Sequence, residues 1–111
     1  MRSDFRINLE TTLKDNPRFR VSPVGIIAQL MLKDDCFTIA ILAELMDRSS
    51  ANVTRWFRTG TGKVGNSIEQ TQEVNEKLTK IAKIVRQCHM QDVTLCVDGK
   101  LEILRRLKAE G

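Results

Sequence analysis

The sequence predicts a mainly α-helical fold, a small helical bundle that contains two short helices joined by a tight turn. A long helix and then a β-hairpin or a short helix are expected to follow. Three observations carry this prediction. Apolar residues make up 41% of the 111 residues, enough for a core. They recur mostly at three- and four-residue spacing, and serines that suit helix N-caps precede several of these runs.

Helix signals divide the first half of the chain into short helices. An apolar side chain recurs every four residues from Phe5 to Leu13, which predicts a helix over residues 5–14. A proline behind a capping serine begins a second helix over residues 23–33. Residues 37–46 are apolar almost all round, as in a helix at the centre of a bundle. The proline-containing segment between the first two helices is expected to be a loop.

A long helix is predicted from Ser67 to Met90, because Ser67 and Gln70 form a capping box. Its apolar residues step by four and three in the heptad manner: Val74, Leu78, Ile81, Val85 and Cys88. This seam predicts pairing with a second copy of the chain. The sequence also leaves open that the helix folds back on its own bundle. We therefore expect the chain to divide into a helical domain at 1–64 and a dimerisation region at 65–111.

The tail carries two competing signals. Val93 to Val97 alternates as a strand does, and Asp98-Gly99 suits a type I′ turn, so a hairpin is favoured. Residues 101–107 also suit a helix with its leucines inward, and the structure after Gly99 stays open between the two.

Catalytic and metal-binding patterns are missing from the sequence. Cys36, Cys88 and Cys96 have no CxxC spacing, so free, buried or half-buried thiols are expected rather than a disulfide or a metal site. His89 is the single histidine, and it has no nucleophile or carboxylate pair beside it in the sequence. Residues 59–64 lack the spacing of a phosphate loop. We expect no enzyme, no cofactor and no metal, in a soluble cytoplasmic protein without a membrane span.

The positive charge is concentrated in one window. The formal charge is +4, and residues 48–68 hold four cations and no acid, while the rest of the chain holds 14 of each sign. Solvated helix faces usually mix both signs, so this window predicts a surface that faces phosphates.

The segment from Ala43 to Arg58, AELMDRSSANVTRWFR, has the residue types of a helix-turn-helix. Ala43 is small where two helices would meet, and Val53 and Trp56 are placed to face inward. Small polar and basic residues are available for the opposite face of the second helix. The segment resembles the λ-repressor/Cro-like helix-turn-helix family of DNA-binding proteins. It departs from that family at Asp47, where glycine is common, and at Ile39, where a phosphate-binding glutamine is common.

The resemblance makes residues 1–64 the expected helix-turn-helix DNA-binding domain, and it implies a set of contacts on double-stranded B-form DNA. Asn52 would pair with adenine, Arg55 with guanine, and Ala51 would pack on a thymine methyl group. Ser50, Arg58 and Lys63 would hold phosphates. The complete predicted set is Ser49, Ser50, Ala51, Asn52, Thr54, Arg55, Arg58 and Lys63.

The function expected from this reading is sequence-specific transcriptional regulation. A homodimeric repressor of phage or mobile-element type would bind a two-fold operator. Two alternatives remain open. One is a DNA packaging or replication accessory protein that uses the same motif in a larger oligomer. The other is a protein-binding module that modulates RNA polymerase or a host factor.

Overall fold

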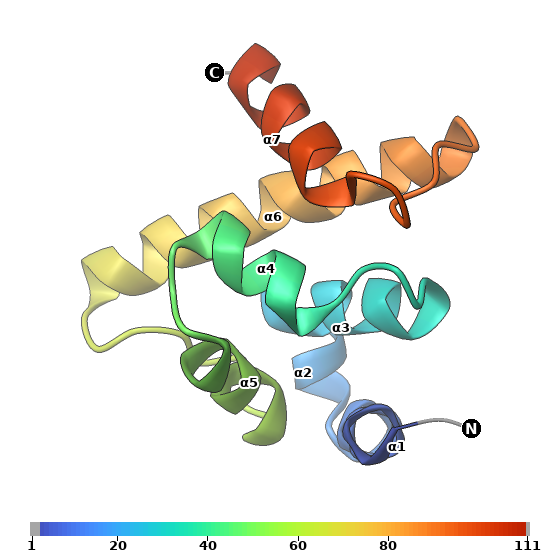
Figure 1. The fold of residues 1–111 in the computed structure, drawn as a ribbon. Helices are drawn as coiled ribbons and strands as arrows, with labels where there is room; N and C mark the ends of the chain where they lie inside the picture. The colour runs from blue at the N-terminus through green and yellow to red at the C-terminus, as the bar shows by residue number, and fades with distance from the viewer. Residues whose placement is uncertain (1–2, 111) are drawn as a thin grey trace.

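A computed structural model describes residues 3–110 of the chain (Figure 1). Within these residues it forms seven α-helices and no strand, so the prediction of a mainly helical fold is confirmed. The helices are α1 (Asp4–Asp15), α2 (Pro17–Val21), α3 (Pro23–Lys33), α4 (Ile39–Met46), α5 (Ser50–Arg58), α6 (Ile68–Met90) and α7 (Gly99–Glu110). None of the helices in this part of the chain is long and apolar enough to cross a membrane.

Side-chain caps begin five of these helices, and the serines among them are why four of these starts could be predicted. The hydroxyl of each capping residue accepts a hydrogen bond from a backbone amide three residues on, and the caps are Ser3, Ser22, Thr38, Ser49 and Ser67. Because Thr38 is a cap, α4 begins at Ile39, two residues after the predicted start. Residues 17–21, expected in a loop, form a short helix that buries Phe19 in the core.

The centre of the core lies between α3 and α6, which pack along one another (Figure 1). The predicted heptad residues of α6 are all part of this core, with exposed fractions between 0% at Leu78 and 5% at Val74. The alternative in which the long helix folds back on its own bundle is the one observed. In this conformation the seam is covered by the chain itself and has no face left for a second copy.

The predicted hairpin in the tail is wrong. Residues 91–98 form turns and loop, and the chain is helical from Gly99 onward. The leucines of this helix are not all inward, because Leu101 is 60% exposed. A type I′ turn needs two successive residues with positive φ, but here Asp98 has φ 55° and Gly99 does not adopt a positive φ. The carbonyl of Asp98 instead accepts the amide of Glu102 at 3.0 Å, which begins α7. The helix also carries Ile103 into the core, where it is fully buried.

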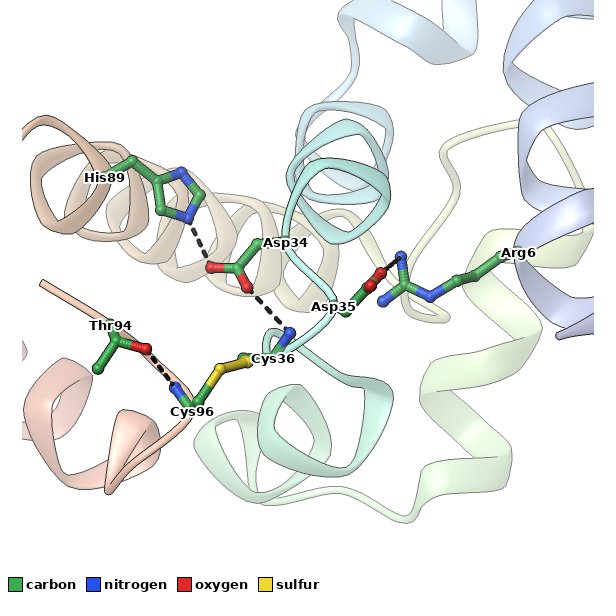
Figure 2. The surroundings of a disulfide bond; sticks show 7 residues. All are labelled: Arg6, Asp34, Asp35, Cys36, His89, Thr94 and Cys96. Carbon is green, nitrogen blue, oxygen red and sulfur yellow. Dashed lines mark hydrogen bonds and ion pairs between the residues drawn. A yellow bond between two sulfur atoms is a disulfide. The ribbon is translucent and has the colours of Figure 1, made fainter. Parts of the chain in front are cut away.

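The cysteine prediction is wrong for two of the three residues. Cys36 and Cys96 form a disulfide with a Cα–Cα distance of 4.8 Å across a separation of 60 residues (Figure 2). Cys88 is a free, buried thiol, as expected. Spacing in the sequence could not indicate the bond, because only the fold brings the α3–α4 loop beside the α6–α7 connection.

Candidate nucleic-acid interface

A tight turn joins α4 to α5 and sets their relative orientation. Asp47 adopts the left-handed conformation, with φ 56° and ψ 48°. Its amide donates to the carbonyl of Glu44 at 3.2 Å, and the amide of Arg48 donates to the carbonyl of Ala43 at 3.0 Å. These two bonds close the helix end as a Schellman motif does. Aspartate therefore takes the place in the turn where glycine is common, as its tolerance of this conformation predicts.

An apolar face fixes α5 against the rest of the protein. Val53, Trp56 and Phe57 are buried, and the ring of Phe57 meets that of Phe5 edge-on at 6.3 Å between centroids. The inward placement predicted for Val53 and Trp56 is confirmed. Packing against α1, α3 and α4 thus determines which side of α5 faces outward.

The outward side of α5 carries the predicted DNA-contacting residues. Ala51 and Arg55 are exposed along its middle, and Arg58 is exposed at its C-terminal end. Asn52 and Thr54 are half-buried on its two flanks. Ser49, Ser50 and Lys63 are exposed as well. None of the eight predicted residues is buried, so each can reach a ligand at this surface.

The structure brings three of the predicted residues to one surface hollow. Asn52 and Arg55 line it from α5, and Lys63 lines it from the following loop. The other lining residues are Trp56, Thr59, Thr61, Gly65 and Asn66. Thr59, Thr61 and Asn66 lie in the acid-free window but are not among the predicted contact residues. This hollow therefore combines amide, hydroxyl and cationic groups, the donors that bind phosphates and base edges.

Two other predicted residues face a different side of the helix. Thr54 and Arg58 line a second hollow with Arg6 of α1 and Thr38, the N-cap of α4. Arg58 also lines a third hollow with Asp4. The fold thus brings an acidic residue near the window that lacks acids in the sequence. The predicted surface divides into an Arg55–Lys63 side and an Arg58 side.

The loop after α5 has a defined backbone that positions Lys63. Val64 is fully buried, and the amide of Lys63 donates to the hydroxyl of Thr61 at 3.2 Å. Gly62 has φ 76°, and a Cβ there would lie 2.9 Å from the side chain of Ser22. Val64 and Gly62, on either side of Lys63, are both packed against the rest of the fold. They therefore fix the backbone of Lys63 relative to α5.

No family model, curated protein or solved structure matches this chain. Inferences about its function therefore depend on the residues and geometry of this surface.

Proposed function

We propose that the chain is a sequence-specific, double-stranded DNA-binding protein that reads the major groove with α5 and regulates transcription. The observation that supports this proposal most is the two-sided character of α5. Its inner side is tied into the core through Val53, Trp56 and Phe57, and its outer side presents Ala51 and Arg55 in a window without acids. A helix of this kind, held by a second helix across a tight turn, has the arrangement of a helix-turn-helix.

The proposed contacts follow from where each residue lies. Arg55 is exposed on the middle of the helix, a position suited to bidentate pairing with guanine. Ala51 lies one turn before it and suits a thymine methyl group, while Asn52 on the flank suits adenine. Lys63, in the loop after α5, and Arg58, at the end of α5, line different hollows and suit phosphates on the two edges of the groove.

The proposal includes a homodimer on a two-fold site, but through a surface other than the heptad seam. That seam is occupied by the contact between α3 and α6. Dimerisation through the seam would require the chain to open its own core. Mass measured in solution, with and without DNA, decides between a dimer and the larger ring of a packaging protein.

Selection of bound sites from random duplex DNA tests the central proposal. We expect an enriched motif, followed by a fall in affinity with salt whose logarithmic slope is about −2 per protomer, because two cations, Arg58 and Lys63, meet phosphates. Lys108→Ala is the charge-matched control for the loss of Lys63, because Lys108 is also an exposed lysine but lies on α7. Absence of enrichment together with absence of salt-dependent binding would reject DNA recognition and favour a protein partner.

A further inference from the structure

We propose that the Cys36–Cys96 disulfide is a redox-sensitive tether that holds α7 against α4 and thereby regulates the DNA-binding surface. The effect on DNA rests on the function proposed above, while the tether itself does not. The bond joins the loop just before α4 to the connection just before α7. Cys36 lies two residues before Thr38, the residue that caps α4.

The two sides of the bond differ in how firmly they are otherwise held. On the Cys36 side, one oxygen of Asp34 accepts the amide of Cys36 at 2.9 Å, and the other lies 2.7 Å from Nε2 of His89 on α6 (Figure 2). The neighbouring Asp35 pairs with Arg6 of α1 at 3.3 Å (Figure 2). The loop before α4 therefore keeps its anchor to α6 through Asp34 when the disulfide opens, while the exposed Asp35–Arg6 pair adds little.

The Cys96 side is anchored mainly to α6. The amide of Val93 donates to the carbonyl of Cys88 at 2.8 Å, and the side chain of Arg106 on α7 donates to the side chain of Gln91 at 2.9 Å. The amide of Cys96 bonds only to the nearby hydroxyl of Thr94, at 3.1 Å (Figure 2). Leu95 is the fully packed apolar residue of this connection, and Ile103 is the large buried residue of α7. The ion pairs of α7 with other helices are largely exposed and hold it weakly: Lys100 with Glu44 and Glu110 with Lys83. Leu104 and Leu107 of α7 are partly buried against the core as well. Opening the bond is therefore expected to loosen α7 from α4, while the contacts of α7 with α6 remain and the loop before α4 stays anchored.

The start of α7 lies directly on the first helix of the proposed DNA-binding pair. A Cβ at Gly99 would lie 3.9 Å from Cδ1 of Ile41, and Lys100 pairs with Glu44 at 3.3 Å. Loosening α7 removes this cover from α4. The α4–α5 pair is then more mobile in the free protein and loses more conformational entropy when it binds DNA. The affinity of the protein for DNA therefore falls.

The chemistry is a thiol–disulfide exchange with a dithiol. A thiolate of the dithiol attacks Sγ of Cys96, which is exposed, and Cys36 leaves as a thiolate and takes up a proton. The second thiol of the dithiol then attacks the first sulfur of the same dithiol, which is bonded to Sγ of Cys96 in the mixed disulfide. Cys96 leaves as the second thiolate and is protonated. The dithiol is oxidised to a cyclic disulfide, and the protein gains two hydrogens. Cys88 stays out of the exchange because it is buried, and burial raises the pKa of its thiol.

Hydrogen exchange of the full chain, with and without dithiothreitol as the dithiol, tests the tether without DNA. We expect reduction to speed amide exchange most in residues 93–110, while α3 and α6 remain the slowest-exchanging helices. The variants Cys36→Ser and Cys96→Ser should each exchange like the reduced protein and ignore the reagent. The matched control, Cys88→Ala, should keep the response. The proposal is overturned if exchange in α7 does not change on reduction. It is also overturned if Cys36 and Cys96 both react with a thiol reagent before dithiothreitol is added.

DNA titration of the same samples tests the regulation. Using a site obtained by selection, the reduced protein should bind on the order of tenfold more weakly than the oxidised protein. Equal affinities of the two states, with α7 loosened, would overturn the regulatory part. If neither state binds DNA while α7 still loosens on reduction, the proposed function fails and the tether stands.

Discussion

The guanidinium carbon of Arg48 lies 5.6 Å from the centroid of the Trp56 ring. The contact joins the turn after α4 to the buried side of α5. Arg48 is one of the four cations of the acid-free window, but this position gives it a part in packing. The window's charge is therefore divided between one cation that holds α5 in place and three that face outward.

Replacing Arg48 should weaken the fold. We expect Arg48→Ala to lower the free energy of unfolding by about 1 kcal/mol, since it removes the cation–π contact and the packing of the side-chain stem. Urea unfolding followed by tryptophan fluorescence measures this, because Trp56 is the single tryptophan. Arg55→Ala is the matched control and should change stability by less than about 0.5 kcal/mol. Equal losses in both variants would show that the stacking contributes nothing.

Arg55 and Lys63 should affect DNA binding in different ways. Arg55→Ala is expected to weaken binding to the selected site by about 1–3 kcal/mol and to relax the preference at one base pair. Lys63→Ala should weaken binding to all sequences alike and make the salt slope shallower by about 1 unit. Titration against the selected site and a scrambled site measures both. Sequence-blind losses of equal size would contradict base reading by Arg55.

The heptad seam of α6 should govern stability rather than association. Leu78 is fully buried in the chain's own core. Leu78→Ala is therefore expected to lower the free energy of unfolding by about 3 kcal/mol, through lost burial and the cavity left behind. Light scattering should give the same molar mass for the variant and the wild type. A lower mass at unchanged stability would place the seam between two chains.

Removing the disulfide should also cost stability. In the chain-entropy model, a closed loop of 60 residues contributes about 4 kcal/mol. The double variant Cys36→Ser/Cys96→Ser should unfold at a correspondingly lower urea concentration. The wild type with dithiothreitol should fall to the same midpoint, which separates loss of the bond from side effects of serine. A midpoint that neither change moves would mean that the bond does not constrain the chain.

Part of the stability of α7 should depend on pH through the carboxyl group of Glu102. The side chain of Arg106 donates a hydrogen bond to Glu102 at 2.9 Å and, together with Arg105, holds the pKa of this carboxyl below the usual 4.5. Because the pKa is lower in the folded state, the contribution is complete above the usual pKa. It is lost as the pH falls through the lowered value. Carboxyl titration by NMR should show a larger rise of this pKa in Arg106→Gln than in Arg105→Gln, and the reverse order would contradict the assignment.

Local signals in the sequence account for most of the helices. Capping serines, a proline at a first helical position and regular apolar spacing are short-range features, and they placed α1, α3, α5 and α6 near their observed bounds. The same signals misled in the tail, because Asp98-Gly99 suits both a hairpin turn and a helix start. The burial of Ile103 in the core, a long-range contact, favours the helix there.

The sequence by itself was enough to establish a helical protein, the outward residues of α5 and the inward placement of Val53 and Trp56, because each follows from the helical repeat. Only the tertiary structure decided three other matters. It paired Cys36 with Cys96, it buried the α6 seam against α3, and it divided the basic window into an Arg55–Lys63 side and an Arg58 side. Each of these depends on contacts between residues far apart in the chain, which the helical period does not encode.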